Sequence, residues 1–160
     1  MSVEKEIEIL LVEDDPNDAE LSIGALRKHH LDERVHLIRD GAEALDCITE
    51  IGSETPLASL RTVKLIILDL KLTRVSGLEI LKKARSLERT KLIPVVILTS
   101  SAEADDVFQC YQCGANSYVV KPMDYDKYTE VVANLGYYWI VQNHSPLSLS
   151  TSPRNHGAAA

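Results

Sequence analysis

The stretch Leu65-Ile66-Ile67-Leu68-Asp69 consists of four large apolar residues followed directly by an aspartate. A short apolar run of this kind is typical of a strand that is buried on both faces of a sheet. The aspartate then stands at the carboxyl end of the strand, which is the edge where open α/β sheets bind their ligands. We therefore take Asp69 as the first candidate functional residue.

Similar apolar runs with β-branched residues recur along the chain, and each is followed by a polar turn and a longer segment with helical spacing. The expected strands cover residues 7–12, 35–38, 63–68, 94–98 and 118–120. Strands that alternate with helices imply a parallel sheet covered on both faces. The expected fold class is therefore α/β: a doubly wound, flavodoxin-like sheet of five parallel strands in the order 2-1-3-4-5, with five helices.

Polar residues follow the other expected strands as well. Glu13 and Asp14 come after the first strand, Thr99 after the fourth and Lys121 after the fifth. Because the carboxyl ends of parallel strands meet at one edge, these side chains should converge on Asp69. Two carboxylates about 4 Å apart repel each other by roughly 4 kcal/mol at an effective dielectric constant near 20, so the cluster requires a divalent cation.

With these motifs in place, the chain resembles the response regulator receiver domains of two-component signalling, from about Ile7 to Leu135. The resemblance rests on motifs that stand in the family's order, which are Val12-Glu13-Asp14-Asp15-Pro16, Leu68-Asp69-Leu70-Lys71, Leu98-Thr99-Ser100 and Val119-Val120-Lys121-Pro122. The long loop before the third strand and the stretch Tyr137-Tyr138-Trp139-Ile140-Val141 are similar to single-domain receivers that are paired with bacterial phytochrome-type histidine kinases.

The resemblance implies that Asp69 is the phosphoacceptor, which takes a phosphoryl group from a phosphohistidine of the kinase. It also implies a Mg²⁺ site, which would accept Mn²⁺ as well, made by Asp14, Asp69, Glu13 through water, and the backbone carbonyl of Lys71. Asp15 is the less favoured ligand, because the motif places Glu13 and Asp14 in the paired acidic positions. Such a protein is expected to be no enzyme beyond transferring the phosphoryl group to itself and releasing it slowly.

The resemblance further assigns residues around the phosphate. Lys121 would pair its ammonium with the phosphoryl oxygens, and its bond to Pro122 is expected to be cis. Thr99 would donate its hydroxyl to the phosphoryl group, and the small Ser100 would leave room for donor and water. Tyr118 matches the aromatic switch position, whose inward turn changes the surface around the fourth helix, the fifth strand and the fifth helix.

The loop after Asp69 departs from the pattern of many receivers. Thr73 stands where proline is common and Ser76 where aspartate is common, whereas Gly77 fits the pattern. We expect these differences to change the rigidity of the loop and the lifetime of the phosphate. Neither difference removes a required ligand.

Three other interpretations use the same residues. A haloacid-dehalogenase-like phosphatase also forms an aspartyl phosphate, but Lys71 stands where that family needs a second aspartate as general acid and base. A flavodoxin-like cofactor binder is disfavoured because Glu13, Asp14 and Asp15 would repel the phosphate of a flavin. A receiver-like interaction module that has lost phosphorylation stays open, although its candidate phosphoacceptor is present.

The composition narrows the location and the partners. The chain has 160 residues and a formal charge of −7, which disfavours direct binding to nucleic acid or to an anionic membrane. No apolar run approaches the roughly 20 residues of a membrane span, so we expect a cytoplasmic protein. Cys47, Cys110 and Cys113 are expected to be reduced thiols, because an odd number is untypical of a disulfide framework and no second pair completes a zinc site.

The expected organisation is a receiver domain over residues 1–141, which includes the aromatic extension, and a disordered tail over 142–160. Without an output domain in this chain, the signal would pass through changed protein contacts, with a histidine kinase on one side and a downstream target or phosphotransfer protein on the other. The stretch Tyr137-Tyr138-Trp139 is compatible with a homodimer interface and, nearly as well, with capping of the core.

Overall fold

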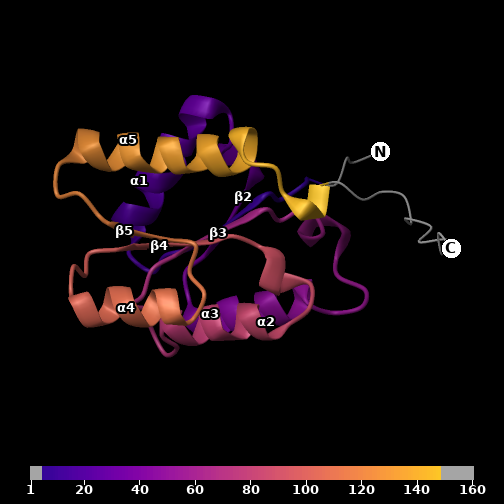
Figure 1. Cartoon of the computed structure of the whole chain (residues 1–160). Helices are drawn as coiled ribbons and strands as arrows, with labels where there is room; N and C mark the ends of the chain where they lie inside the picture. The colour runs from indigo at the N-terminus through magenta and orange to yellow at the C-terminus, as the bar shows by residue number, and fades with distance from the viewer. Residues whose placement is uncertain (1–4, 149–160) are drawn as a thin grey trace, which may run out of the picture.

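The computed structural model describes residues 5–148 of the chain, which form a single parallel sheet covered by helices (Figure 1). The strands are β1 (Ile9–Val12), β2 (Val35–Ile38), β3 (Leu65–Leu68), β4 (Val95–Thr99) and β5 (Ser117–Val120). They lie in the order β2-β1-β3-β4-β5, and every adjacent pair is parallel. The predicted fold class and strand order are therefore confirmed.

The described residues contain five α-helices, of which four connect successive strands and the fifth follows β5. They are α1 (Pro16–Leu26), α2 (Gly41–Ile51), α3 (Gly77–Ser86), α4 (Ala104–Gln112) and α5 (Tyr125–Gly136). Figure 1 shows α1 and α5 on one face of the sheet and α2, α3 and α4 on the other. The sheet is thus covered on both faces, as the alternation of strands and helices predicts.

The central strand β3 divides its side chains between two cores. Leu65 and Ile67 pack into the core that α1 and α5 cover, whereas Ile66 and Leu68 pack into the core that α2 and α3 cover. All four side chains are buried, because successive residues of a strand point to opposite faces and both faces are covered. Asp69 is then the first residue after the run, at the open carboxyl edge of the sheet.

The register of the strands brings the predicted site residues to this one edge. The last residues of β1 and β3 pair with each other, so Glu13 and Asp69, which follow them, lie side by side. The last residues of β4 and β5 also pair, which places Thr99 beside the start of the segment that carries Lys121.

After α5 the chain continues as a π-helical turn, η5 (Tyr137–Gln142). Trp139 and Ile140 pack against the core that α1 and α5 cover, whereas Tyr138 and Val141 are exposed. The aromatic extension therefore caps the core with some of its side chains and leaves others on the surface.

The sequence predicts a disordered tail from residue 142 onward, and this is wrong for residues 142–148. Gln142 is the last residue of η5, Ser145 is buried, and Leu147 packs against the core. The pattern of the segment does not reveal this packing, because it supplies a single apolar contact rather than a periodic face. Residues 149–160 lie outside the described residues, and the division of the chain at residue 141 stays a prediction.

Two further expectations concern the membrane and the thiols. Within residues 5–148, none of the helices combines the length and the apolar character that a bilayer span requires. Cys47, Cys110 and Cys113 are free thiols, of which Cys110 is buried and the other two are half-buried.

Candidate functional site

Three carboxylates meet at the carboxyl edge of the sheet. Glu13 and Asp14 follow β1 and Asp69 follows β3, and each offers an oxygen within 4.8 Å of the others. Glu13 and Asp69 are buried, and Asp14 is half-buried. The backbone fixes the pair, because the N–H of Asp69 donates to the carbonyl of Val12 (3.1 Å) and that of Glu13 to the carbonyl of Ile38 (3.0 Å). The structure thus brings together the three carboxylates that the sequence predicts.

One oxygen of this cluster has no donor nearby. The Oε2 atom of Glu13 is buried, and no hydrogen-bond donor from residues 5–148 reaches it. A buried polar atom without a partner is costly, so either a proton or a cation is needed at this position. Because hard divalent cations take oxygen ligands, these residues fit a cation of the Mg²⁺ type.

Lys121 supplies a positive charge to the same cluster. Its backbone N–H donates to the carbonyl of Thr99 (2.7 Å), which fixes the start of the segment after β5. Its ammonium donates to Oδ2 of Asp69 (2.9 Å), to Oδ2 of Asp18 (2.8 Å) and to Oε1 of Glu13. Since the side chain is only 9% exposed, Lys121 is a buried cation surrounded by carboxylates.

Burial and neighbouring charges shift the proton affinity of each group. Burial, with Asp69 acting in the same direction, raises the pKa of Glu13 to about 8, against the effect of Lys121. Burial alone would raise the pKa of Asp69, but hydrogen bonds with Glu13 and Lys121 lower it overall. Burial alone would lower the pKa of Lys121, and the surrounding carboxylates raise it overall. At neutral pH and without a cation, the cluster therefore favours a protonated Glu13 beside an ionised Asp69.

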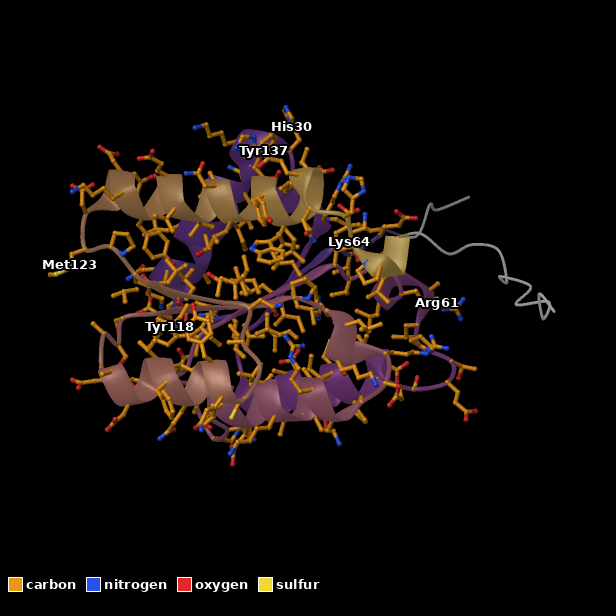
Figure 2. All side chains as sticks on the ribbon, in the orientation of Figure 1. His30, Arg61, Lys64, Tyr118, Met123 and Tyr137 are labelled. Atoms are coloured by element: carbon orange, nitrogen blue, oxygen red, sulfur yellow. The ribbon has the colours of Figure 1, made fainter. Side chains whose placement is uncertain are left out.

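Of the predicted phosphate-binding and switch residues besides Lys121, Thr99 contacts this cluster directly. Thr99 is fully buried, its hydroxyl helps to lower the pKa of Asp69, and it accepts the N–H of Ser101 (3.4 Å). Ser100 is exposed. Tyr118 lies between the sheet and α4 (Figure 2), and its hydroxyl donates to the carbonyl of Ser101 (2.8 Å). Ser101 thus connects the threonine beside Asp69 with the predicted switch tyrosine.

Comparison with known families agrees with this geometry. The response regulator receiver domain model matches residues 9–133, which span all five strands and the whole site. The chain belongs to this family. The haloacid-dehalogenase-like and flavodoxin-like interpretations are thereby dropped.

Two similar proteins match this receiver over most of their own length. The probable methanogenesis regulatory protein FilR2 of Methanothrix harundinacea is 35% identical over 86% of this chain and 86% of its own. The response regulator Rcp1 of Synechocystis is 31% identical over 82% of this chain and 88% of its own.

Three solved structures share the fold of this receiver. The phosphorylated cyanobacterial phytochrome response regulator RcpA has a TM-score of 0.77 and 29% identity, over 88% of this chain and 99% of that chain. The Mn²⁺-bound form of Rcp1 has a TM-score of 0.75 and 30% identity over the same shares. The bacteriophytochrome response regulator RtBRR has a TM-score of 0.64 and 42% identity, over 88% of this chain and 84% of that chain. The predicted similarity to phytochrome-type receivers is confirmed.

The predicted cis bond between Lys121 and Pro122 is wrong for this receiver. No peptide bond in the part of the chain that the structure describes is cis. A trans bond before proline is favoured by about 0.5–1 kcal/mol unless the surroundings require otherwise. The ammonium of Lys121 reaches its carboxylate partners with the trans bond in place.

Two residues around the predicted ligands have other roles in this receiver. Asp15 caps α1, because its side chain accepts the N–H groups of Asn17 (2.8 Å) and Asp18 (3.0 Å), which agrees with its low rank as a ligand. The N–H of Lys71 donates to Oδ1 of Asp69 (3.4 Å), so the loop turns back on the carboxylate. The use of the Lys71 carbonyl as a metal ligand stays a prediction.

The sequence motifs do not predict the polar contacts made by two residues of the receiver. Asp18, which binds Lys121, is the third residue of α1, where side chains point back toward the start of the helix. Its place in the first turn after the acidic motif is the signal that could have found it. Ser101, not Ser100, donates its hydroxyl to Asp106 (2.5 Å), and its carbonyl accepts the hydroxyl of Tyr118, the predicted switch residue. Only the course of the loop decides between the two serines.

Proposed function

We propose that this receiver accepts a phosphoryl group on Asp69 from the phosphohistidine of a histidine kinase, in the presence of Mg²⁺, and signals by changing its protein contacts. The main support is that the Asp69 carboxylate meets two further carboxylates and the Lys121 ammonium at one edge of the sheet. A buried carboxylate that is paired with a cation and adjoins a metal-type cluster suits phosphoryl transfer, which depends on positioning and charge neutralisation.

Glu13, Asp14 and Asp69 would hold the cation, with the backbone carbonyl of Lys71 as a further oxygen ligand. Mg²⁺ is usually bound by one or two carboxylates together with waters and phosphate oxygens, and Mn²⁺ accepts the same ligands. When bound, the cation would neutralise charge on the phosphoryl oxygens. The unpartnered Oε2 of Glu13 supports this site, as does the Mn²⁺-bound form of the similar Rcp1.

The side chains of the site would divide the work of the transfer. A carboxylate oxygen of Asp69 would attack phosphorus, and the bond from phosphorus to the kinase imidazole would break and leave its electron pair on nitrogen. Lys121 would move its ammonium from Asp69 onto a phosphoryl oxygen. The Thr99 hydroxyl would donate to another oxygen, and the small, exposed Ser100 would leave room for it. The receiver would thus perform its own phosphorylation and slow release, with no further catalysis.

The signal would reach the surface through Ser101. Phosphorylation adds about −1.5 to −2 charges, which would draw the Thr99 hydroxyl toward the phosphate. The N–H of Ser101 contacts Thr99 and its carbonyl holds Tyr118, so a shift of Thr99 would release the tyrosine. The surface that responds would be that of α4, β5 and α5, where Phe108 is exposed and Met123 points away from the molecule (Figure 2).

Incubation with Mg²⁺ and acetyl phosphate, followed by intact-mass measurement, tests the proposal. Wild type should gain an acid-labile phosphoryl group, whereas Asp69→Asn should gain none. Asp15→Asn is a matched control, because Asp15 caps α1 and asparagine is an equally good cap, so it should be phosphorylated like wild type. No adduct on wild type would refute phosphorylation and favour a receiver-like interaction module. An equal adduct on Asp69→Asn would refute Asp69 as the phosphoacceptor.

We propose that the phosphoryl donor is a phytochrome-type histidine kinase, which the similarity to RcpA and RtBRR supports. The signal would pass to a downstream protein target or a phosphotransfer protein. The free thiols support a location in the reducing cytoplasm. The exposed Tyr138 and Val141 support a homodimer.

Transfer of labelled phosphate from a purified phytochrome kinase, faster than from an unrelated kinase, would test the choice of phosphoryl donor.

A further inference from the structure

Thr73 forms a bond across the candidate site. It lies in the loop between β3 and α3, and its hydroxyl donates to Oδ2 of Asp14 (3.2 Å), which follows β1. When one oxygen of a carboxylate is held in this way, the rotation of the group is fixed. The other oxygen of Asp14 then has a defined direction relative to Glu13 and Asp69.

A tight turn brings Thr73 to Asp14. The carbonyl of Thr73 accepts the N–H of Val75 (2.9 Å), which closes a three-residue turn with Arg74 at its centre. Arg74 has a φ of +70°, in the left-handed region that residues other than glycine rarely occupy. Such a conformation is strained and persists only where the surrounding structure enforces it.

Contacts with the start of α2 hold Arg74 in this conformation. Nε of Arg74 donates to Oδ1 of Asp40 (3.1 Å) and its Nη2 donates to Oδ2, so the guanidinium and the carboxylate share two bonds. Asp40 is the N-cap of α2. The first helical residue, Gly41, lies so close that an added Cβ would come within 2.4 Å of the carbonyl oxygen of Val75. The loop is thus held against α2 on one side while Thr73 contacts Asp14 on the other.

We propose that Thr73 is a positioning residue for the cation site: it orients the Asp14 carboxylate, and the Arg74–Asp40 ion pair holds Thr73 in place. The inference rests on the proposed function, because it concerns the same carboxylate cluster. Carboxylates that bind metals usually accept hydrogen bonds from residues around them, and loss of such a residue typically lowers metal affinity by about 10- to 100-fold. Since Thr73 is exposed, the lower end of this range applies.

Binding of Mn²⁺ alone, measured by electron paramagnetic resonance titration, tests this role. Thr73→Val keeps the size of the side chain and removes the hydroxyl, so Kd should rise about 10-fold. Thr73→Ser keeps the hydroxyl and should bind close to wild type. Thr49→Val is the matched control, because the hydroxyl of Thr49 on α2 bonds the carbonyl of Leu45 instead of a carboxylate of the site, and its Kd should not change.

A double-mutant cycle tests the ion pair. Arg74→Gly removes the guanidinium while glycine still accepts a positive φ. This variant should bind Mn²⁺ more weakly than wild type, and it should have no further effect in the Thr73→Val background, because the ion pair acts through Thr73. If the two substitutions lower the affinity for Mn²⁺ additively, the proposal that the ion pair acts through Thr73 is overturned.

The remaining outcomes separate this inference from the proposed function. Thermal unfolding without metal checks that every variant is folded. If wild type binds Mn²⁺ and Thr73→Val binds it equally well, the inference is overturned while the proposed function stands. If Thr73→Ser loses as much affinity as Thr73→Val, the hydroxyl is not responsible and the inference again fails. If wild type neither binds Mn²⁺ nor takes a phosphoryl group, both fail together.

Discussion

Lys121 holds its ammonium against three acidic side chains, and two of them, Glu13 and Asp69, are about as buried as the lysine itself. Removing one partner of a buried ion pair leaves the other charge uncompensated, which is far more costly than the net contribution of the intact pair. We therefore expect Lys121→Met to lower the free energy of unfolding by about 3 kcal/mol in urea denaturation with EDTA.

Lys64→Met is the matched control for this loss. Lys64 pairs with Glu8, which is also bound by Arg34, so Glu8 keeps a cationic partner in the variant. The expected loss is below about 1 kcal/mol. Mg²⁺ should recover part of the lost unfolding free energy in Lys121→Met, because the cation supplies positive charge to the cluster. It should recover none in Lys64→Met. Equal losses in the two variants would contradict the role assigned to Lys121.

Cys47 and Cys110 are poor nucleophiles in this structure. Burial, reinforced by Glu43 and Glu50, raises the pKa of Cys47 to about 11, and burial, reinforced by Asp106, raises the pKa of Cys110 to about 11. Because the thiolate is the reactive form, both should react with iodoacetamide at pH 8 about 100-fold more slowly than in the unfolded chain, and faster as pH rises toward 11. Peptide mapping after timed labelling measures this, and rapid labelling of either at pH 8 would disprove it.

The residues of the site differ in how far the sequence could predict them. Glu13, Asp69 and Lys121 each follow a clear apolar run, and parallel strands in register must bring their carboxyl ends together. Thr73 acts through a turn with a positive φ, and Asp18 through the direction of its side chain in a first helical turn. Neither feature leaves a periodic signal in the sequence. The place of Asp18 in the first turn after the acidic motif is the only sequence clue to its contact, and the Thr73 contact is visible only in the fold.

At the level of elements, the start of α3 packs directly on the end of β3. Gly77 is the first residue of α3, and an added Cβ would lie 2.1 Å from the carbonyl oxygen of Asp69 and 2.8 Å from Cα of Leu70. Both are backbone atoms, which cannot move without displacing Asp69. We expect Gly77→Ala to destabilise the protein by about 1–3 kcal/mol and to slow phosphorylation by acetyl phosphate.

Gly24 in α1 gives a matched control, because an added Cβ there meets nothing within 4 Å. Alanine is a better helix former than glycine, so Gly24→Ala should stabilise the protein by about 0.5–1 kcal/mol and leave the rate with acetyl phosphate unchanged. Urea denaturation and intact-mass time courses measure both quantities. If the two alanine variants had the same stability and the same phosphorylation rate, the close packing of α3 on β3 would not explain the need for glycine at position 77.

Contacts between elements were harder to predict than the elements themselves. Arg85 of α3 donates to the carbonyls of Gly114 (2.8 Å) and Ile93 (2.9 Å) and to the side chain of Asn116 (2.7 Å). These bonds join α3 to the start of β4 and to the turn before β5. In the sequence, Arg85 is a charged residue near a helix end, which usually means an exposed surface position. Apolar periodicity thus predicts strands and helices but not the polar bonds that join their connections.

Across the whole molecule, exposed apolar side chains gather on the later elements. Phe108 and Tyr111 of α4 are 64% and 50% exposed, Val120 of β5 is 42% exposed, and Met123 after it is fully exposed. A group of large exposed apolar residues marks an interaction surface more strongly than scattered ones do. Tyr118 and Val120 are both residues of β5, so the proposed switch lies on a strand that also carries part of this exposed surface.

The η5 extension allows an interface role to be separated from a capping role. Trp139 packs against the core, whereas Tyr138 and Val141 are 49% and 55% exposed. If the extension joins two copies, the double variant Tyr138→Ser/Val141→Ser should convert a dimer into a monomer in sedimentation velocity. Its unfolding temperature at low concentration should hardly change, because exposed side chains contribute little to the stability of the monomer. Trp139→Ala should lower that temperature.

Leu57→Ser is the control for the loss of an exposed apolar side chain, because Leu57 is 62% exposed and lies in the loop before β3. This variant should leave the dimer intact. Wild type that sediments as a monomer from micromolar to millimolar concentration would end the homodimer proposal. A Tyr138→Ser/Val141→Ser protein that stays dimeric but unfolds at a lower temperature would instead assign the extension to capping alone, since the same two side chains would then stabilise the fold without joining two copies.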